Sequence, residues 1–200
     1  MNMKRPLPRA TSAADGSGIS NPLSLHHHFP TSCRIFYSHV LQSHIHLAMA
    51  KFPTGTDGKQ LDAIARAPLW AAGLDFAHGT GHGVGHVLSV HEGPANISKS
   101  GDLALEAGMV LSNEPGYYQT GDWGIRIENL VVVTPAKQTG FLEFETITLC
   151  PLDRRLIDKT LLDAGEIGWI DHYHRAVYEQ LHPHLSPMAK SWLEVACCPL

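Results

Sequence analysis

The sequence is poor in cysteine, in charge and in long apolar runs. Its four cysteines stand at positions 33, 150, 197 and 198 without a CxxC pair, and the two adjacent ones would form a strained bridge with each other. This usage favours a reducing, cytoplasmic setting over a disulfide framework. No window approaches the ~20 consecutive apolar residues of a transmembrane helix, so the sequence predicts no association with a membrane.

Basic charge is scarce as well. Fifteen Lys and Arg against nineteen Asp and Glu give a formal charge of −4, and no basic stripe interleaved with aromatic residues occurs, which excludes nucleic acid as a partner. The first residues, MNMKRPLPRATSAADGSG, carry basic charge but no apolar run follows them, so a secretory signal is excluded too. With 44% apolar and 17% charged residues, the chain is expected to form one soluble domain.

Histidine, in contrast, is abundant. Four of the fourteen histidines, His78, His82, His86 and His91, fall within fourteen consecutive residues, and we expect function to reside in this cluster. Three adjacent histidines nearer the N-terminus lack spaced partners on a rigid element and are interpreted as a solvated polar tract. They belong to residues 1–32, rich in Pro, Ser, Gly and Asn, which we expect to be an atypical, disordered leader.

Apolar periodicity outlines an α+β domain. A period of 3.6 residues predicts helices, and β-branched runs bounded by Gly, Pro and Asp predict strands. The expected helices cover 35–51, a segment ending at Gly73, 156–162, 166–181 and 187–196, and the expected strands cover 109–113, 125–133 and 141–149. Thr56 or Asp57 caps the second helix, and Pro68 should bend or divide it. Three strands suggest an antiparallel sheet, followed by a helical tail.

The string HGTGHGVGH, which begins at His78, favours extended chain. Its four glycines oppose a helix, because each costs about 1 kcal/mol relative to alanine in a helix interior. In an extended chain His78, His82 and His86 point to one side, together with Thr80 and Val84. The other side is all glycine, so another backbone or a ligand can approach it closely.

Two glutamates complete the pattern. Glu114 ends one expected strand, and Glu128 lies inside the next, where alternation places it on the same face as Arg126. A hairpin through 115–124 would bring the two carboxylates side by side. Because buried carboxylates repel one another and raise a pKa, a metal ion or Arg126 must supply the compensating charge.

Taken alone, a histidine or a glutamate on a strand is more often a structural or solvent-facing residue. The combination of imidazole and carboxylate groups on short, converging elements favours a site for Mn²⁺, Co²⁺ or Zn²⁺. The pair His91 and Glu92 does not begin the metalloprotease signature HExxH, because residue 95 is alanine and Gly93 with Pro94 precludes the helix that this signature requires.

At these residues the sequence resembles the Xaa-Pro aminopeptidases, which belong to the pita-bread dinuclear metallopeptidases together with prolidase, methionine aminopeptidase and creatinase. The most specific runs are HGTGHGVG, VHEGP, SNEPGYY and GIRIENLVVV. The resemblance implies a partial pita-bread fold, in which helices flank a curved antiparallel sheet. It also implies two parts, with 33–137 as the C-terminal part of the catalytic domain and 138–200 as the C-terminal extension of the larger aminopeptidases.

The same resemblance implies roles for five residues. His82, Glu114 and Glu128 become metal ligands, and Glu128 bridges two ions. His78 and His91 bind the scissile amide and move protons, and Glu114 takes part as a general base. In that family two divalent ions per complete site activate water for attack on the bond before proline, with Mn²⁺ expected and Zn²⁺ or Co²⁺ as alternatives.

The sequence departs from the family pattern at two points. His86 stands where the family commonly has a small residue, and we give it no role. The family also takes two ligands from aspartates upstream of the first helix, where this chain reads NPLSLHHHFPTSCR; Asp15 lies in the leader, and Asp57 and Asp62 lie downstream. Because only three of the five family ligands are present, we expect this chain to be a C-terminal fragment. The alternative is that a separate chain supplies the missing half of the site.

The expected activity is metal-dependent removal of an N-terminal residue from peptides with proline at the second position. The alternative is a noncatalytic remnant or interaction module that keeps the fold. Prolidase or creatinase chemistry is less favoured, because the tail after Pro151 resembles the aminopeptidases. Half of the fold would expose a sheet face that its other half covers, so we expect a homodimer or a complementing catalytic half as partner.

Overall fold

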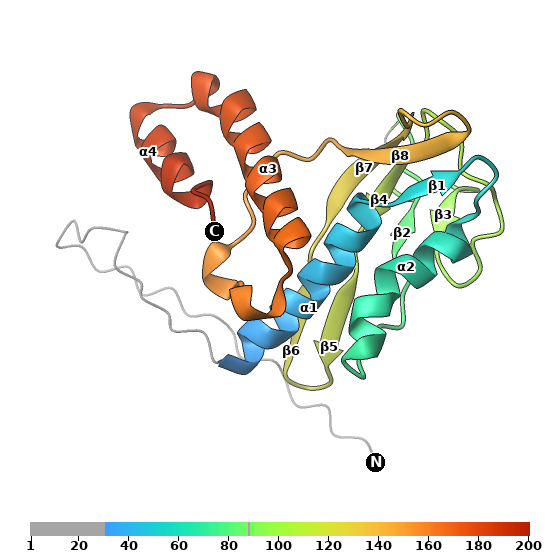
Figure 1. Cartoon of the computed structure of the whole chain (residues 1–200), viewed down its shortest axis with the longest axis horizontal. Coiled ribbons are helices and arrows are strands. Elements are labelled where there is room, and N and C mark those ends of the chain that lie inside the picture. Colours follow the sequence, from blue (N-terminus) through green and yellow to red (C-terminus); the bar gives the residue numbers. More distant parts are fainter. Residues whose placement is uncertain (1–30, 88) are drawn as a thin grey trace, which may run out of the picture.

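A four-stranded antiparallel sheet forms the centre of the computed structural model, which describes residues 31–87 and 89–200. Its strands, in spatial order, are β1 (Lys51–Pro53), β8 (Phe141–Thr146), β7 (Asn129–Pro135) and β4 (Val110–Asn113). The helices α1 (Thr31–Ala48) and α2 (Gly58–Ala71) lie side by side across one face of the sheet (Figure 1). The expected α+β class and antiparallel sheet are confirmed. The predicted leader lies outside the described residues, except for its last two, which begin α1.

Two short strand pairs extend this arrangement. The strands β2 (Gly81–His82) and β3 (Asn96–Ile97) pair with each other, and β5 (Gly116–Gln119) forms a hairpin with β6 (Trp123–Arg126). The single strand predicted at 125–133 is therefore wrong, because the chain leaves the hairpin after Arg126 and enters the main sheet at Asn129.

Helix α1 separates two apolar cores. Toward its C-terminal end, Leu47 packs with α2 and the sheet, where Leu111 and Val131 are fully buried. Near its middle, Leu41 packs instead with the C-terminal region, including Ile170. The helix begins earlier than the sequence predicted, at Thr31. It also ends earlier, because Lys51 and the next residues form β1 and pair with β8. Because it contributes to both cores, α1 joins the sheet to the C-terminal region.

The second helix has the predicted ends but not the predicted break. The side chain of Asp57 accepts the backbone N–H of Gln60, whose side chain in turn accepts that of Asp57, which is a complete capping box. Gly73 follows the helix with a φ of +73°, a conformation that glycine adopts without strain. We expected Pro68 to bend or divide this segment; it lies inside an uninterrupted helix, so the division is wrong.

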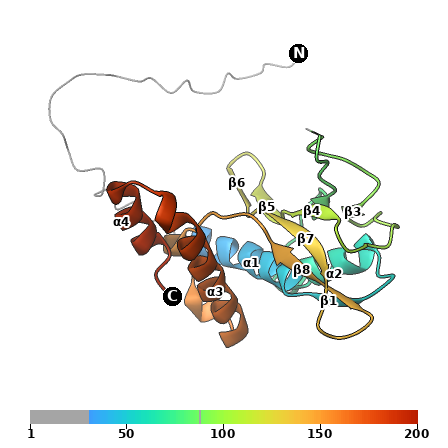
Figure 2. The same ribbon diagram turned by 90° about the horizontal axis from the view of Figure 1, so that it is seen from above.

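The C-terminal region contains α3 (Ala164–Leu181) and α4 (Pro187–Ala196). In Figure 2, α3 and α4 lie on one side of α1, and α2 lies on its opposite side. The helix predicted at 156–162 is wrong, because two 3₁₀ turns, Arg154–Leu156 and Lys159–Leu161, replace it. A third such turn, His182–His184, links α3 to α4. Among the described residues, none of the helices has the length and hydropathy needed to span a bilayer.

Candidate metal centre

The paired ends of β4 and β7 carry the two glutamates. Asn113 lies opposite Asn129 in the antiparallel register, and Glu114 and Glu128 are their immediate neighbours in sequence. Because side chains alternate along a strand, the asparagines face helix α1 and the glutamates face the other side of the sheet. The contact of Asn113 with the carbonyl oxygen of His44 in α1 agrees with this. The structure thus brings the two carboxylates together, as the expected hairpin requires.

His82 approaches these carboxylates from β2. Its backbone N–H donates to Ser112 Oγ (3.0 Å), and that hydroxyl donates to Glu114 Oε1 (2.9 Å). The ring Nδ1–H donates to the carbonyl oxygen of Gly83 (2.9 Å), which leaves the lone pair on Nε2, 3.2 Å from Glu114 Oε1. Metal-ligating histidines commonly have such a second hydrogen bond, because it fixes the tautomer and the ring orientation.

The donor atoms of His82, Glu114 and Glu128 all lie within 4.8 Å of one another. One imidazole nitrogen with two carboxylates suits a divalent ion of the manganese, cobalt or zinc class. Arg126 Nη1 lies 3.3 Å from Glu114 Oε2 and places positive charge beside a side chain that is only 11% exposed. The three residues therefore fit a divalent cation.

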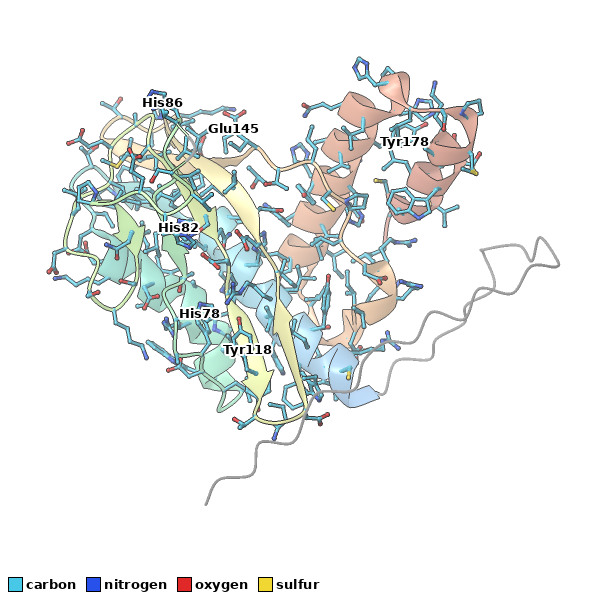
Figure 3. The ribbon with its side chains drawn as sticks, turned by 180° about the vertical axis from the view of Figure 1, so that it is seen from behind. His78, His82, His86, Tyr118, Glu145 and Tyr178 are labelled. Carbon is cyan, nitrogen blue, oxygen red and sulfur yellow. The ribbon has the colours of Figure 1, made fainter. Side chains whose placement is uncertain are left out.

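His78 lies at one end of this group, beside the β5–β6 hairpin. Its Nδ1–H donates to the carbonyl oxygen of Gly79 (2.7 Å), and its Nε2 lies 2.8 Å from the hydroxyl of Tyr118. Arg126 Nε–H donates to the same hydroxyl (2.9 Å), so Tyr118 donates its own proton to His78. Figure 3 shows His78 beside Tyr118. Sequence reasoning missed Tyr118, although its place on a strand four residues after Glu114 was a usable signal.

The other two histidines of the cluster are exposed. His91 stacks on His82 with ring centroids 3.9 Å apart, next to the three donors but not among them. His86 lies farther along the same segment, beyond His82 as seen from His78 (Figure 3). The structure therefore places His91 near the site and His86 away from it.

The segment that carries these histidines is not one extended strand. Only Gly81 and His82 are in a strand, and Thr80 is buried, where its hydroxyl donates to Asp62 Oδ1 (2.5 Å). The expectation that Thr80 shares a face with the histidines is therefore wrong. The expected close approach at a glycine is confirmed, because a Cβ on Gly81 would lie 2.0 Å from the carbonyl oxygen of Ser112.

A buried arginine fixes the start of this segment. Arg66, in α2, is 1% exposed and pairs with Asp62 (2.8 Å) and Asp75 (2.6 Å). Its guanidinium also donates to the carbonyl oxygens of Phe76 and His78, each at 2.7 Å. This role could not be predicted from the sequence, because an arginine in an amphipathic helix usually lies on the solvent face.

Comparison with known families agrees with this geometry. Residues 26–135 match the model of metallopeptidase family M24, and residues 140–200 match that of the C-terminal region of peptidase M24. The chain belongs to metallopeptidase family M24. The recognition made from the sequence runs is thereby confirmed.

Relatives of this M24 chain are considerably longer. A probable Xaa-Pro aminopeptidase P of Coprinopsis cinerea is 46% identical over 182 residues, which are 86% of this chain and 29% of the relative. The crystal structure of X-prolyl aminopeptidase from Caenorhabditis elegans, described as a cytosolic enzyme with a di-nuclear active site, matches with a TM-score of 0.80 and 44% identity, over 86% of this chain and 29% of that one.

A more distant match is the Xaa-Pro dipeptidase from Bacillus anthracis, with a TM-score of 0.53 and 30% identity, over 62% of this chain and 33% of that one. These neighbours confirm the expected pita-bread fold. The chain spans less than a third of the length of the Coprinopsis relative.

Proposed function

We propose that this chain serves the metal-dependent removal of an N-terminal residue that precedes proline. The observation that carries the proposal is the convergence of His82, Glu114 and Glu128, whose donor atoms lie within 4.8 Å in an M24 chain. The likeness to a probable Xaa-Pro aminopeptidase P supports peptides with proline at the second position as substrates. The C. elegans enzyme supports a cytosolic setting, as do four free cysteines.

We assign a divalent cation to His82 Nε2 and to the carboxylates of Glu114 and Glu128, with Mn²⁺ as the expected ion and Co²⁺ or Zn²⁺ as alternatives. Divalent ions at such a site acidify water and polarise the carbonyl that is attacked. The chain prepares the donors in advance, because Gly83 fixes the tautomer of His82 and Ser112 orients Glu114.

The remaining side chains handle protons. Glu114 accepts the proton of the attacking water, and Arg126 Nη1, 3.3 Å from Glu114 Oε2, places positive charge beside it. His78 keeps one proton on Nδ1 through Gly79 and exchanges another at Nε2. His91 presents an exposed ring over His82, where it can meet the amide of a bound peptide.

Three protein donors are too few for two metal ions. A site with one histidine and two glutamates leaves a second ion without adequate ligands, so a complementing catalytic half must supply further carboxylates. The sheet face that carries the glutamates also exposes part of Leu130 and Val132, and it offers a surface for that half or for a second copy of this chain. The same shortage of donors favours the alternative, a noncatalytic interaction module with one weakly bound ion.

Calorimetric titration with Mn²⁺ tests the metal assignment. We expect the chain to bind one ion, and Glu128→Gln to weaken binding by at least about tenfold, because it removes a charged ligand. His86→Asn is the matched control and should bind as the unchanged chain does, since His86 is exposed and outside the donor group. Absence of binding by the unchanged chain would contradict the assignment.

A peptidase assay separates the two functions. The chain is mixed with Mn²⁺ and with the part of the Coprinopsis relative that precedes the matched region. We expect release of the first residue from peptides with proline second, and none from the same peptides with alanine there. Single-ion binding without turnover in the presence of that segment would support the noncatalytic module.

A further inference from the structure

His44 lies fully buried on helix α1, behind the strands that carry the glutamates. Asn113 Nδ2 donates to its backbone carbonyl oxygen (2.9 Å), and Asn129 Nδ2 donates to its ring Nε2 (3.1 Å). All three residues are at most 4% exposed. A single helical residue therefore holds β4 with its backbone and β7 with its side chain.

Each of these asparagines adjoins a glutamate of the metal centre. Asn113 precedes Glu114 and Asn129 follows Glu128, and the two asparagines are partners in the sheet register. Because neighbouring residues of a strand share one stiff backbone and point to opposite faces, a shift of an asparagine displaces the adjacent carboxylate. The separation of the two carboxylates thus depends on contacts made on the far side of the sheet.

The C-terminal region closes this contact. The hydroxyl of Tyr173, in α3, lies 3.4 Å from Asn129 Oδ1 and 2.9 Å from the carbonyl oxygen of Cys150. Trp169 stacks on Tyr173 and meets the His44 ring edge-on at 5.9 Å. Helix α3 therefore places Trp169 against His44 and Tyr173 against Asn129, at the two ends of a hydrogen bond for which water would otherwise compete.

We propose that His44 is a positioning residue of the metal centre, which sets the separation of Glu114 and Glu128 through the two asparagines. The C-terminal region then contributes to the site by sealing this contact. The inference rests on the metal assignment proposed above. Removing a direct hydrogen-bond partner of a metal ligand typically changes metal affinity by about 10–100-fold. His44 acts through the residues next to the ligands, so we expect the lower end of that range.

The test compares two buried histidines in the whole 200-residue chain. His44→Leu removes the ring acceptor that faces Asn129, and His44→Gln places a side-chain oxygen there instead. His174 is the matched control, because it is also fully buried and its Nε2 accepts a backbone N–H, that of Leu152 (3.0 Å), within the C-terminal region. His174→Leu should therefore destabilise the fold without moving the glutamates.

Each variant is measured in two ways. The absorption spectrum during Co²⁺ titration gives the affinity, and hydrogen–deuterium exchange of the metal-free chain gives the opening of the strands. We expect His44→Leu to weaken Co²⁺ binding about tenfold and to speed exchange in β4 and β7, and His44→Gln to restore both. His174→Leu should leave the Co²⁺ affinity unchanged. If His44→Leu does not fold, Asn129→Ser removes the same hydrogen bond from the strand side and provides the same comparison.

Equal effects of His44→Leu and His174→Leu on Co²⁺ affinity would overturn the proposal, as would an unchanged affinity in His44→Leu. If the unchanged chain binds no Co²⁺, the proposed function fails instead. The exchange data then decide separately whether His44 holds the two strands, because they require no metal.

Discussion

The two sides of the candidate metal centre are held in place by different means. Glu114 and Glu128 adjoin paired strands, whose register sets their relative position. The histidines of residues 78–91 come from a segment in which only Gly81 and His82 belong to a strand. Its shape depends on isolated backbone hydrogen bonds, such as that from Val84 N–H to the carbonyl oxygen of Val110, and on a few side chains. The glutamates depend instead on a continuous hydrogen-bonded ladder.

This difference has a consequence for single substitutions. A ladder distributes its stabilisation over many backbone bonds, which side-chain changes leave intact. An irregular segment has only isolated backbone hydrogen bonds, and here it also relies on one buried guanidinium and on a close backbone approach at Gly81. Removing either of these should shift the segment more than a side-chain change shifts a ladder. We therefore expect substitutions to displace the histidine segment more than the strands that carry the glutamates. The exception is protonation of a buried group behind those strands.

Arg66→Leu should have the largest effect on the fold. It removes a buried guanidinium that pairs with Asp62 and binds the carbonyl oxygens of Phe76 and His78. Breaking a buried ion pair by removing one partner typically costs about 3–5 kcal/mol, because the other charge remains buried without compensation. Urea denaturation should show a loss of unfolding free energy of that size, together with faster hydrogen exchange at residues 76–80.

Lys99→Met is the matched control for this prediction. Lys99 pairs with the same Asp75, at 3.0 Å against 2.6 Å for Arg66, but the Lys99 side chain is 62% exposed. Burial alone would raise the pKa of Asp75, yet hydrogen bonds from Lys99 and Arg66 lower it to about 2. An exposed pair contributes at most about 1 kcal/mol, so equal losses in the two variants would contradict a special role for Arg66.

The strand side should weaken in acid. Burial lowers the pKa of His44 to about 4, against 6.5 in the unfolded chain. Above pH 6.5 neither state binds the proton, and between 6.5 and 4 only the unfolded state does, so stability falls as pH falls through this window. The His44 contribution amounts to roughly 3 kcal/mol, fully lost near pH 4.

Urea midpoints measured between pH 7 and 4.5 check this dependence. His174, whose pKa burial likewise lowers to about 4, adds a similar decline. His44→Gln should therefore flatten the profile without abolishing it, because one of the two buried histidines remains. A profile as steep as that of the unchanged chain would show that His44 is not the group that titrates on unfolding.

The features that the sequence predicted are those with a local cause. The hairpin that brings Glu114 beside Glu128 follows from turn composition and strand periodicity within one short segment, although Glu128 lies between β6 and β7 and not inside one strand as expected. The glycines of the histidine segment signalled a close backbone approach, which the structure confirms at Gly81. A cap for α2 was also expected, at Thr56 or Asp57, and the structure places it at Asp57.

The features that it missed depend on contacts between distant segments. Arg66 and His44 resembled ordinary helical residues, because nothing near them in sequence shows what the helix packs against. The helix expected at 156–162 failed for a local reason, since Asp153 and Asp158 each accept a backbone N–H two residues later and favour 3₁₀ turns. The spacing of apolar residues does not show that these aspartates favour 3₁₀ turns over a continuous α-helix.

Gly81→Ala should have an intermediate effect, on the histidine side only. The added Cβ would lie 2.0 Å from the carbonyl oxygen of Ser112, so the two backbones must separate. Overpacking of this kind typically costs about 1–3 kcal/mol, and it should also move His82 and weaken Mn²⁺ binding. Thermal unfolding and calorimetry measure the two effects.

Gly168→Ala is the control for the added methyl group. Gly168 lies in α3 with nothing within 4 Å of the new Cβ, so alanine should stabilise the helix by about 0.5–1 kcal/mol. Mn²⁺ affinity should not change. If Gly81→Ala bound Mn²⁺ as well as Gly168→Ala, the close approach to Ser112 would have no part in placing His82.

Tyr118→Phe should have the smallest effect on stability and a specific effect on His78. The lost hydroxyl is partly exposed, so the net cost should be at most about 1 kcal/mol. Without it His78 Nε2 loses its donor, and the ring ¹⁵N chemical shifts of His78 should change while those of His82 remain. Tyr117→Phe is the matched control on the same strand, because its hydroxyl faces Gln119 at 3.4 Å. Unchanged His78 shifts in Tyr118→Phe would show that the contact does not orient this ring. A change at His78 without one at His82 would show that the two histidines are oriented by separate contacts.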